Sequence, residues 1–266
     1  MRKIAIIGGT GFGNPEVLGV KFDKQIVHTP YGDALCHIGE MAGNQVVFIT
    51  RHGMGHKIAP HKVNFRANIW ALKSLGTEEI FTTTAVGSLN PAMTAGHFVV
   101  CDNVLDFTKS RINTFYDTEE RGVVHADFTN PYCPVMRQRV INCLKKTDIP
   151  LHEHGVYVAT EGPRFESAAE IKAYRMMGGD LVGMTGMPEA ILAREAEMCY
   201  CTCSIVTNMA AGISKTPLSH MEVVEAMTKS ISNMEKLIAA FITNNEKIEC
   251  GCGCHDALKE FGGFKL

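Results

Sequence analysis

Short apolar runs with strand character alternate along the chain with longer runs of helical periodicity, and this alternation constrains the fold more than any other feature. A regular change between the two periods favours an α/β layered fold around a largely buried, mixed sheet. The strand-like runs are rich in Val, Ile, Phe or Thr, which suits buried strands. We predict strands at residues 3–7, 46–50, 80–86, 98–102, 155–160, 181–184 and 201–207.

Helix boundaries are marked by capping residues and by a proline. Ser167 and Glu170 have the spacing of a capping box, and Ser219 and Glu222 repeat that spacing. Pro188 stands where another helix would begin. We predict helices at residues 62–75, 134–146, 167–177, 188–198 and 219–244.

The composition excludes several classes of protein. The 266 residues are 45% hydrophobic and 20% charged, with a formal net charge of -2, so no overall field would attract nucleic acid or an anionic membrane. No uncharged apolar run reaches the roughly 20 residues that span a bilayer, and the first residues run into a predicted strand whose apolar core is too short for a signal peptide. We expect a cytoplasmic protein with no nucleic-acid or membrane partner.

The ten cysteines fall into two groups. Those within apolar runs are expected to pack in the core as small hydrophobic side chains. They are Cys101, Cys143, Cys199, Cys201 and Cys203.

The second group lies near the C-terminus, where Cys250, Cys252 and Cys254 alternate with glycine and precede His255. Zinc ligands are normally separated by about two to four residues, so this spacing is a poor match for zinc. A tight disulfide and a reactive thiol are open alternatives. Because no repeat or linker divides the rest of the chain, we assign residues 1–245 to one domain and 246–266 to a Cys/Gly-rich tail.

Potential anion-binding groups follow the first three predicted strands. In α/β sheets the ligand site forms where loops leave the carboxyl ends of strands. A glycine-rich turn containing Thr10 follows the first strand, Arg51 and His52 follow the second, and Thr84 and Ala85 lie in the third. Hydroxyls, backbone N–H groups and a guanidinium suit a tetrahedral oxyanion, whereas a tight turn and a solvated basic loop are the plainer alternatives. We identify no metal-ligand cluster there.

Later strand ends carry groups that suit a flat, polar ring. Phe165 and Glu166 follow the strand at 155–160, and Asn208 follows the last one. Phe165 can stack on a ring, Glu166 can accept an N–H bond, and Asn208 offers both a donor and an acceptor. Caps and turns are the structural alternative. The sequence contains no Gly-x-Ser-x-Gly, His-Glu-x-x-His or phosphate-loop signature.

Together these segments resemble the trimeric purine nucleoside phosphorylases, and most closely the methylthioadenosine and methylthioinosine phosphorylase branch. The resemblance runs in family order from residue 4 to about 240. It rests on Gly-Gly-Thr-Gly at 8–11, Thr-Pro-Tyr-Gly at 29–32, Arg-His-Gly at 51–53, Val-Asn-Phe-Arg-Ala-Asn-Ile-Trp-Ala-Leu at 63–72, Glu-Gly-Pro-Arg-Phe at 161–165 and Gly-Met-Thr-Gly-Met-Pro-Glu at 183–189. It implies a single α/β domain with a mixed, partly barrel-like central sheet flanked by helices.

The resemblance also implies a reaction. Phosphate, a co-substrate, and a purine nucleoside give free base and ribose 1-phosphate, with no metal or organic cofactor. The bond between C1′ and N9 breaks with oxocarbenium character. The enzyme must therefore hold a phosphate dianion under C1′ and neutralise the leaving purine, which are tasks of positioning and electrostatics. The implied assembly is a homotrimer, with a hexamer left open.

Site residues are carried over by motif. Those that resemble the phosphate shell are Thr10, Arg51, His52, Thr84, Ala85 through its backbone, and Thr185. Those that resemble the nucleoside site are Met184 under the ribose, Phe165 facing the purine, Glu166 and Asn208 as catalytic base-contacting residues, Ala210, His220, and His125 reaching in from a neighbouring subunit.

Two positions indicate which purine would bind. Adenine-preferring members use two aspartates where this chain has Asn208 and Ala210. Glu166 suits the N1–H donor of a 6-oxopurine, and Asn208 can donate to O6 and accept from a protonated N7. A mismatched base would leave buried polar groups unpaired. We therefore expect inosine and guanosine as substrates.

Alternatives remain at the ribose 5′ end and in function class. His220 matches the 5′-hydroxyl histidine of 6-oxopurine relatives, whereas segment 183–189 resembles methylthioinosine phosphorylase. S-methyl-5′-thioinosine is therefore the second candidate substrate, and S-methyl-5′-thioadenosine is the third. A dinucleotide-binding oxidoreductase, suggested by the glycine-rich turn, and a non-catalytic nucleoside-binding module are the other classes.

Overall fold

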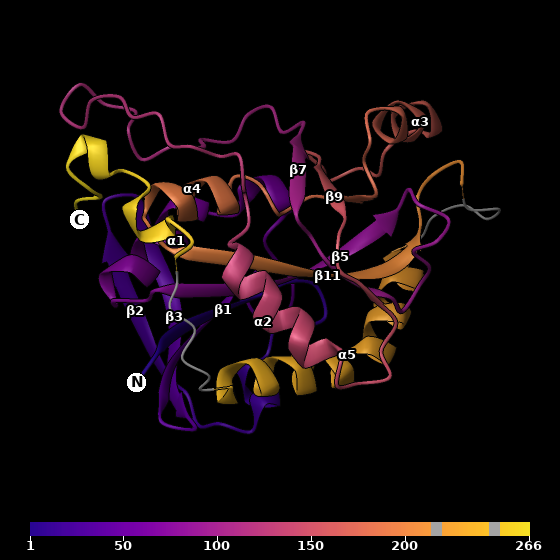
Figure 1. Ribbon diagram of the computed structural model, residues 1–266, viewed down its shortest axis with the longest axis horizontal. Helices are drawn as coiled ribbons and strands as arrows, with labels where there is room; N and C mark the ends of the chain where they lie inside the picture. Colours follow the sequence, from indigo (N-terminus) through magenta and orange to yellow (C-terminus); the bar gives the residue numbers. More distant parts are fainter. Residues whose placement is uncertain (214–219, 245–250) are drawn as a thin grey trace.

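A mixed sheet of eleven strands forms the centre of the molecule, and helices pack against both of its faces (Figure 1). The computed structural model describes residues 1–213, 220–244 and 251–266. In this part of the chain the strands are β1 (Lys3–Gly8), β2 (Asp23–Thr29), β3 (Gly32–Met41), β4 (Asn44–Thr50), β5 (Glu79–Ser88), β6 (Phe98–Val100), β7 (Asn103–Asp106), β8 (Leu151–His152), β9 (Val156–Ala159), β10 (Leu181–Gly183) and β11 (Cys199–Met209). The α-helices are α1 (Phe65–Ser74), α2 (Pro134–Leu144), α3 (Ala168–Met176), α4 (Glu189–Glu195) and α5 (His220–Thr243).

The sheet branches at β5. The first half of β5 pairs in parallel with β1, whereas Gly87 and Ser88 pair antiparallel with β10. Along its other edge β5 pairs in parallel with β11. The order is β2-β3-β4-β1-β5-β10-β9-β7, with β6 bonded to β11 and β8 bonded to β6. Because β4, β1, β5 and β11 are mutually parallel, their carboxyl ends meet at one edge of the sheet.

Alternate residues of the central strands divide between two apolar layers. Ile4 and Ile6 of β1 belong to the cluster formed with α2 and α5, whereas Ala5 and Ile7 belong to the cluster formed with α1 and α4. Successive strand residues point to opposite faces, so both faces of the sheet are covered. Figure 1 shows α2 and α5 together on one side and α1 with α4 on the other. The continuous apolar runs of β1 and β4 follow from this double burial.

The predicted mixed α/β architecture is confirmed, and each predicted helix overlaps one of α1 to α5. The capping box at α3 is confirmed as well: Glu170 N donates to Ser167 Oγ at 3.2 Å, and Ser167 N donates to Glu170 Oε2 at 2.7 Å. The second predicted box lies outside the described residues, because Ser219 and the side chain of Glu222 are not described.

Parts of the sheet differ from the sequence prediction, among them the short strand β8, which is not predicted. The β2–β3 hairpin is not predicted, because β2 is an edge strand whose mostly exposed side chains carry no apolar pattern. The run at 98–102 is predicted as one strand, but β6 ends at Val100 and β7 begins at Asn103. The chain changes partners there, since β6 pairs with β11 and β7 pairs with β9.

The C-terminal segment 251–266 packs against the rest of the chain. Leu258 N and Phe264 N donate to the Glu197 carboxylate at 3.0 and 2.9 Å. The ring of Phe264 lies against Trp70 and Phe115, with ring centroids 5.3 Å apart in both pairs. The segment therefore extends the apolar layer that contains α1.

Burial confirms the expected core role of several cysteines. Cys101, Cys201 and Cys203 have no exposed surface, and Cys143 is 6% exposed. In the described ranges, no helix has both the length and the apolar character needed to cross a membrane.

Candidate active site

A cavity of about 370 Å³ opens at the edge where the carboxyl ends of the parallel strands meet. Its size is that of a site for a small organic ligand. The residues that line it come from β5, β10, β11 and α5 and from the segments that follow β1, β4, β9, β10 and β11. Among them are the predicted residues Thr10, Arg51, His52, Thr84, Ala85, Phe165, Glu166, Met184, Thr185, Asn208 and Ala210.

A buried ion pair stands at the wall of this cavity. Arg51 Nε donates to Glu189 Oε2 at 2.9 Å and Arg51 Nη2 donates to Glu189 Oε1 at 2.8 Å. The two side chains are 0% and 1% exposed. Tyr200 OH and Thr82 Oγ1 also donate to Glu189 Oε1, at 2.9 and 3.1 Å. Burial acts to lower the pKa of Arg51, but the charge and hydrogen bonds of Glu189 raise that pKa above its ordinary value. Arg51 therefore keeps its positive charge.

The guanidinium of Arg51 retains one hydrogen-bond donor for a ligand. Arg has five N–H donors. Besides the two bonds to Glu189, Nη1 donates to the Thr83 carbonyl at 3.0 Å and Nη2 donates to Thr82 Oγ1. Within the described residues this leaves one N–H on Nη1. Nη1 faces the turn after β1, where a Cβ on Gly9 would lie 2.9 Å from it.

Gly8 and Gly9 of that turn are closely packed against the backbone. A Cβ on Gly8 would lie 1.8 Å from the carbonyl oxygen of Phe12, and one on Gly9 would lie 2.5 Å from the carbonyl oxygen of Thr83. The Gly9 N–H donates to Thr83 Oγ1 at 3.1 Å. The Gly9 N–H is therefore already paired within the protein, and Thr10 is the turn residue that lines the cavity.

His52 lies beside Arg51 as a neutral ring. Its Nδ1 lies 2.8 Å from the carbonyl oxygen of Ile58, so Nδ1 carries a proton and donates it. Burial, together with the positive charge of Arg51, lowers the pKa of His52 to about 4. Its Nε2 is therefore an unprotonated acceptor near neutral pH.

Two threonines of the cavity are held in place by buried partners. Thr84 Oγ1 lies 2.8 Å from Ser204 Oγ. The backbone N–H groups of Thr185 and Gly186 both donate to Tyr157 OH at 3.3 Å. Tyr157 is fully buried, so its hydroxyl holds the turn after β10 in a fixed position. These contacts place hydroxyl groups at defined positions in the cavity wall.

Glu166 and Asn208 keep hydrogen-bonding capacity for a ligand. Thr160 Oγ1 donates to Glu166 Oε1 at 2.7 Å, which leaves the second carboxylate oxygen of Glu166. Thr207 Oγ1 donates to Asn208 Oδ1 at 2.7 Å, and Asn208 Nδ2 donates to the Met209 carbonyl at 3.0 Å. Asn208 is left with one N–H and one lone pair. The pair can therefore accept from one ring atom and donate to another.

One predicted residue lies outside this cavity in the single chain, and the position of another relative to it is not described. His125 is exposed and does not line it. His220 begins α5, but its side chain lies outside the described residues.

Val223 and Glu189 are among the site contributions that the sequence did not indicate. Val223 of α5 lines the cavity with an apolar side chain. Glu189 supplies the carboxylate for Arg51, although in the sequence it looks like an ordinary acidic residue in the first turn of a helix. The sequence feature that could have indicated this partnership is the position of Glu189 at the end of the matched segment 183–189.

Residues 3–243 match the family model of the phosphorylase superfamily, and the chain belongs to this superfamily. The chain is 53% identical over 264 residues to the 6-oxopurine nucleoside phosphorylase of Pyrococcus furiosus, which covers 97% of this chain and 98% of that protein. It is 48% identical over 257 residues to a probable S-methyl-5′-thioinosine phosphorylase of Methanocaldococcus jannaschii, covering 96% and 98%.

A solved structure gives the same fold. An adenosine/methylthioadenosine phosphorylase variant from Schistosoma mansoni, in complex with tubercidin, matches with a TM-score of 0.90 and 31% identity, covering 100% of both chains. The family and fold that the sequence resemblance implied are therefore confirmed.

The buried ion pair predicts a large effect on stability. We expect Glu189→Ala to lower the free energy of unfolding by about 3–5 kcal/mol, because the Arg51 charge would remain buried without its partner. Urea denaturation followed by circular dichroism measures this. The control is Glu153→Ala, which removes an exposed pair with Lys145 and should cost less than about 1 kcal/mol. Equal losses in the two variants would contradict the assigned role of Glu189.

The lowered pKa of His52 predicts that acid destabilises the protein. The unfolded chain binds a proton on this ring below about pH 6.5, whereas the folded chain does so only near pH 4. Stability is therefore complete above about 6.5 and falls by about 3 kcal/mol as the pH drops to 4. His52→Gln should flatten this pH dependence of the unfolding free energy. His28→Gln, at an exposed histidine, should leave it unchanged. An unaltered slope in His52→Gln would show that this ring is not protected from protons.

Proposed function

We propose that this protein catalyses the phosphorolysis of 6-oxopurine nucleosides, giving the free base and ribose 1-phosphate. The observation that carries the proposal is that one cavity combines groups for an oxyanion with Glu166 and Asn208 beside Phe165. An anion site alone would fit many enzymes, and a ring site alone would fit a binding module. Their combination fits a reaction between phosphate and a nucleoside.

The phosphate would be held by a permanent charge and by neutral donors. Arg51 contributes its remaining Nη1–H, and Thr10, Thr84 and Thr185 contribute hydroxyls. The neutral His52 contributes Nε2 as an acceptor for the hydroxyl of a hydrogen phosphate ion. The bound anion would stabilise the oxocarbenium character at C1′ as the bond to N9 breaks. This chemistry uses phosphate as co-substrate and no catalytic metal or organic cofactor.

The leaving base would be recognised through its edge. A 6-oxopurine presents N1–H as a donor and O6 as an acceptor, whereas adenine presents N1 as an acceptor and an amino group as a donor. The second oxygen of Glu166 accepts from N1–H, and the remaining N–H of Asn208 donates to O6. As negative charge develops on the base, this donor neutralises it. The high identity to the Pyrococcus furiosus protein supports the same base preference.

S-methyl-5′-thioinosine is the second candidate substrate. Val223 lines the cavity from the first turns of α5, and an apolar side chain there suits a methylthio group better than a hydroxyl. The 48% identity to the probable methylthioinosine phosphorylase favours this substrate too. Both candidates share the 6-oxopurine base, so they differ only at the ribose 5′ end.

We further propose that the active species is a homotrimer in which His125 serves the site of a neighbouring subunit. His125 is exposed in the single chain and lies outside its own cavity, which agrees with such a role. Sedimentation analysis that found a fully active monomer would contradict this assembly.

Base release should require phosphate. Ultraviolet difference spectra would follow cleavage of inosine, guanosine, adenosine, methylthioinosine and methylthioadenosine, with and without phosphate. We expect turnover of the 6-oxopurine nucleosides only when phosphate is present, because the anion itself forms the new bond to C1′. Equal rates in phosphate-free buffer would identify a hydrolase and contradict the proposal.

Glu166 and Asn208 should set the base preference. We expect Asn208→Asp combined with Glu166→Ser to shift the ratio of kcat/KM for inosine over adenosine towards adenosine. The loss of one charge-assisted hydrogen bond costs about 1.5–3 kcal/mol, or roughly one to two decades in that ratio. Thr94→Ser, at an exposed position outside the cavity, is the control. If the wild-type enzyme already prefers methylthioadenosine to inosine and methylthioinosine, the assigned base contacts are wrong.

A further inference from the structure

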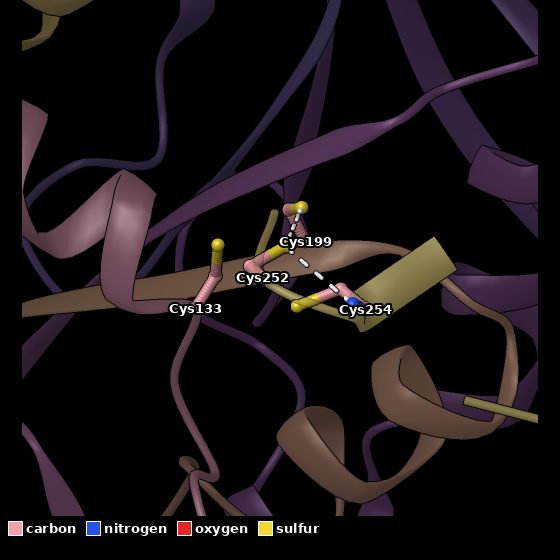
Figure 2. A group of neighbouring side chains, drawn as sticks. All are labelled: Cys133, Cys199, Cys252 and Cys254. Atoms are coloured by element: carbon pink, nitrogen blue, oxygen red, sulfur yellow. Dashed lines mark hydrogen bonds between the residues drawn. The ribbon is translucent and has the colours of Figure 1, made fainter. Parts of the chain in front are cut away.

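Four cysteines from distant parts of the sequence meet on the side of the sheet covered by α2. Cys133 is the N-cap of α2, Cys199 is the first residue of β11, and Cys252 and Cys254 belong to the C-terminal segment. Their Sγ atoms all lie within 4.8 Å of one another. Figure 2 shows the four side chains turned towards a common centre. None of them lines the active-site cavity.

The spacing of the sulfur atoms suits a shared metal ion. The Sγ atoms of Cys199 and Cys252 lie 3.6 Å apart. A disulfide bond is only about 2.05 Å long. Four thiolates at about 2.3 Å from a tetrahedral zinc ion are separated by about 3.8 Å from one another. The measured separation is close to that tetrahedral edge.

The surroundings of the cluster suit a negatively charged thiolate site. Cys133, Cys199 and Cys254 are each 1% exposed, so the cluster is shielded from water. The guanidinium of Arg194 lies 3.6 Å from Cys254 Sγ, measured from Nη1. The backbone N–H of Met136, in the first turn of α2, donates to Cys133 Sγ at 3.5 Å. A cation and oriented N–H groups around metal-bound sulfur are typical of such sites.

We propose that Cys133, Cys199, Cys252 and Cys254 bind one Zn²⁺ ion in a closed, structural site. Four thiols lose their protons to solvent as the four Zn–S bonds form, and no redox step is involved. A site with four protein ligands leaves no open position for substrate, so its role is to hold chain segments together. It joins the C-terminal segment to the start of β11 and the start of α2.

The site explains how the C-terminal segment is held on the domain. Directly after Cys254, the segment is bound by Glu197 and ends with Phe264 packed on Trp70. Two ligands lie within the segment itself, and two lie on the body of the domain. The spacing of Cys252 and Cys254 argues against zinc when the tail is considered alone. The fold supplies the other two ligands, which no spacing rule connects with the tail.

The test measures metal in the full-length protein. The chain is expressed with zinc in the medium, purified anaerobically with a thiol reductant, and examined by elemental analysis. We expect one zinc ion per chain in the wild type. In Cys254→Ala the zinc content should fall roughly tenfold or more, because losing a residue that merely supports a metal ligand already weakens metal binding about tenfold, and this variant loses a ligand itself. Cys36→Ala removes an equally buried cysteine of β3 that lies outside the cluster, and it should keep its zinc.

A second measurement avoids dependence on a variant that fails to fold. The wild-type protein is stripped of metal and titrated with Co²⁺, which reports its geometry by absorption. We expect the intense visible bands of tetrahedral thiolate cobalt, saturating at one ion per chain and displaced by Zn²⁺. The proposal would be overturned if the wild-type protein bound neither ion, or if it showed disulfides among these four cysteines after reductive purification. Full zinc content in Cys254→Ala would overturn it as well.

Discussion

The ion pair of Arg51 and Glu189 is the interaction on which the arrangement of the active-site edge depends. It joins the end of β4 to the first residue of α4, and Thr82 of β5 and Tyr200 of β11 complete its hydrogen bonds. A buried charge is tolerated only when its partners are in place, so four elements are held in one mutual position. The same pairing leaves Arg51 with a full charge and a single donor to offer. The wall of the cavity is therefore electrostatically prepared before any ligand arrives.

A β-bulge near the end of β11 orients side chains in another part of the cavity wall. The pairing of β11 with β5 shifts register between Val206 and Asn208, which makes Thr207 the extra residue of a bulge. A bulge re-aims the side chains that follow it. Thr207 and Asn208 both line the cavity as a result, and the Thr207 hydroxyl orients the amide of Asn208. The strand end thus gives a fixed polar group instead of a flexible loop residue.

Structural features set by residues close in sequence can be predicted from the sequence, whereas contacts between residues far apart in sequence cannot. The strands buried on both faces and the helices with caps are predictable, because apolar runs and capping residues act within a few positions. The edge strand β2 is not, since its exposed side chains leave no pattern. Residues at strand ends can be identified because parallel strands end at one edge. The carboxylate that holds Arg51 and the cysteines around Cys199 cannot, because their partners lie far away in sequence.

The cavity has a rigid part, built on the buried ion pair, and a more exposed part that contains Glu166 and Asn208. This difference suggests how one fold can serve related substrates. The superfamily relatives bear the names of 6-oxopurine nucleoside, methylthioinosine and adenosine/methylthioadenosine phosphorylases. The charged half of the site is built into the sheet and its buried pair, so changing it would cost several kcal/mol of stability. Glu166 and Asn208 are only partly buried, and the hydrogen bonds described for their side chains go to Thr160, Thr207 and Met209. Under the proposed function, exchanging these two residues would alter the base contacts without disturbing the core, so base specificity could change while the buried pair stays in place.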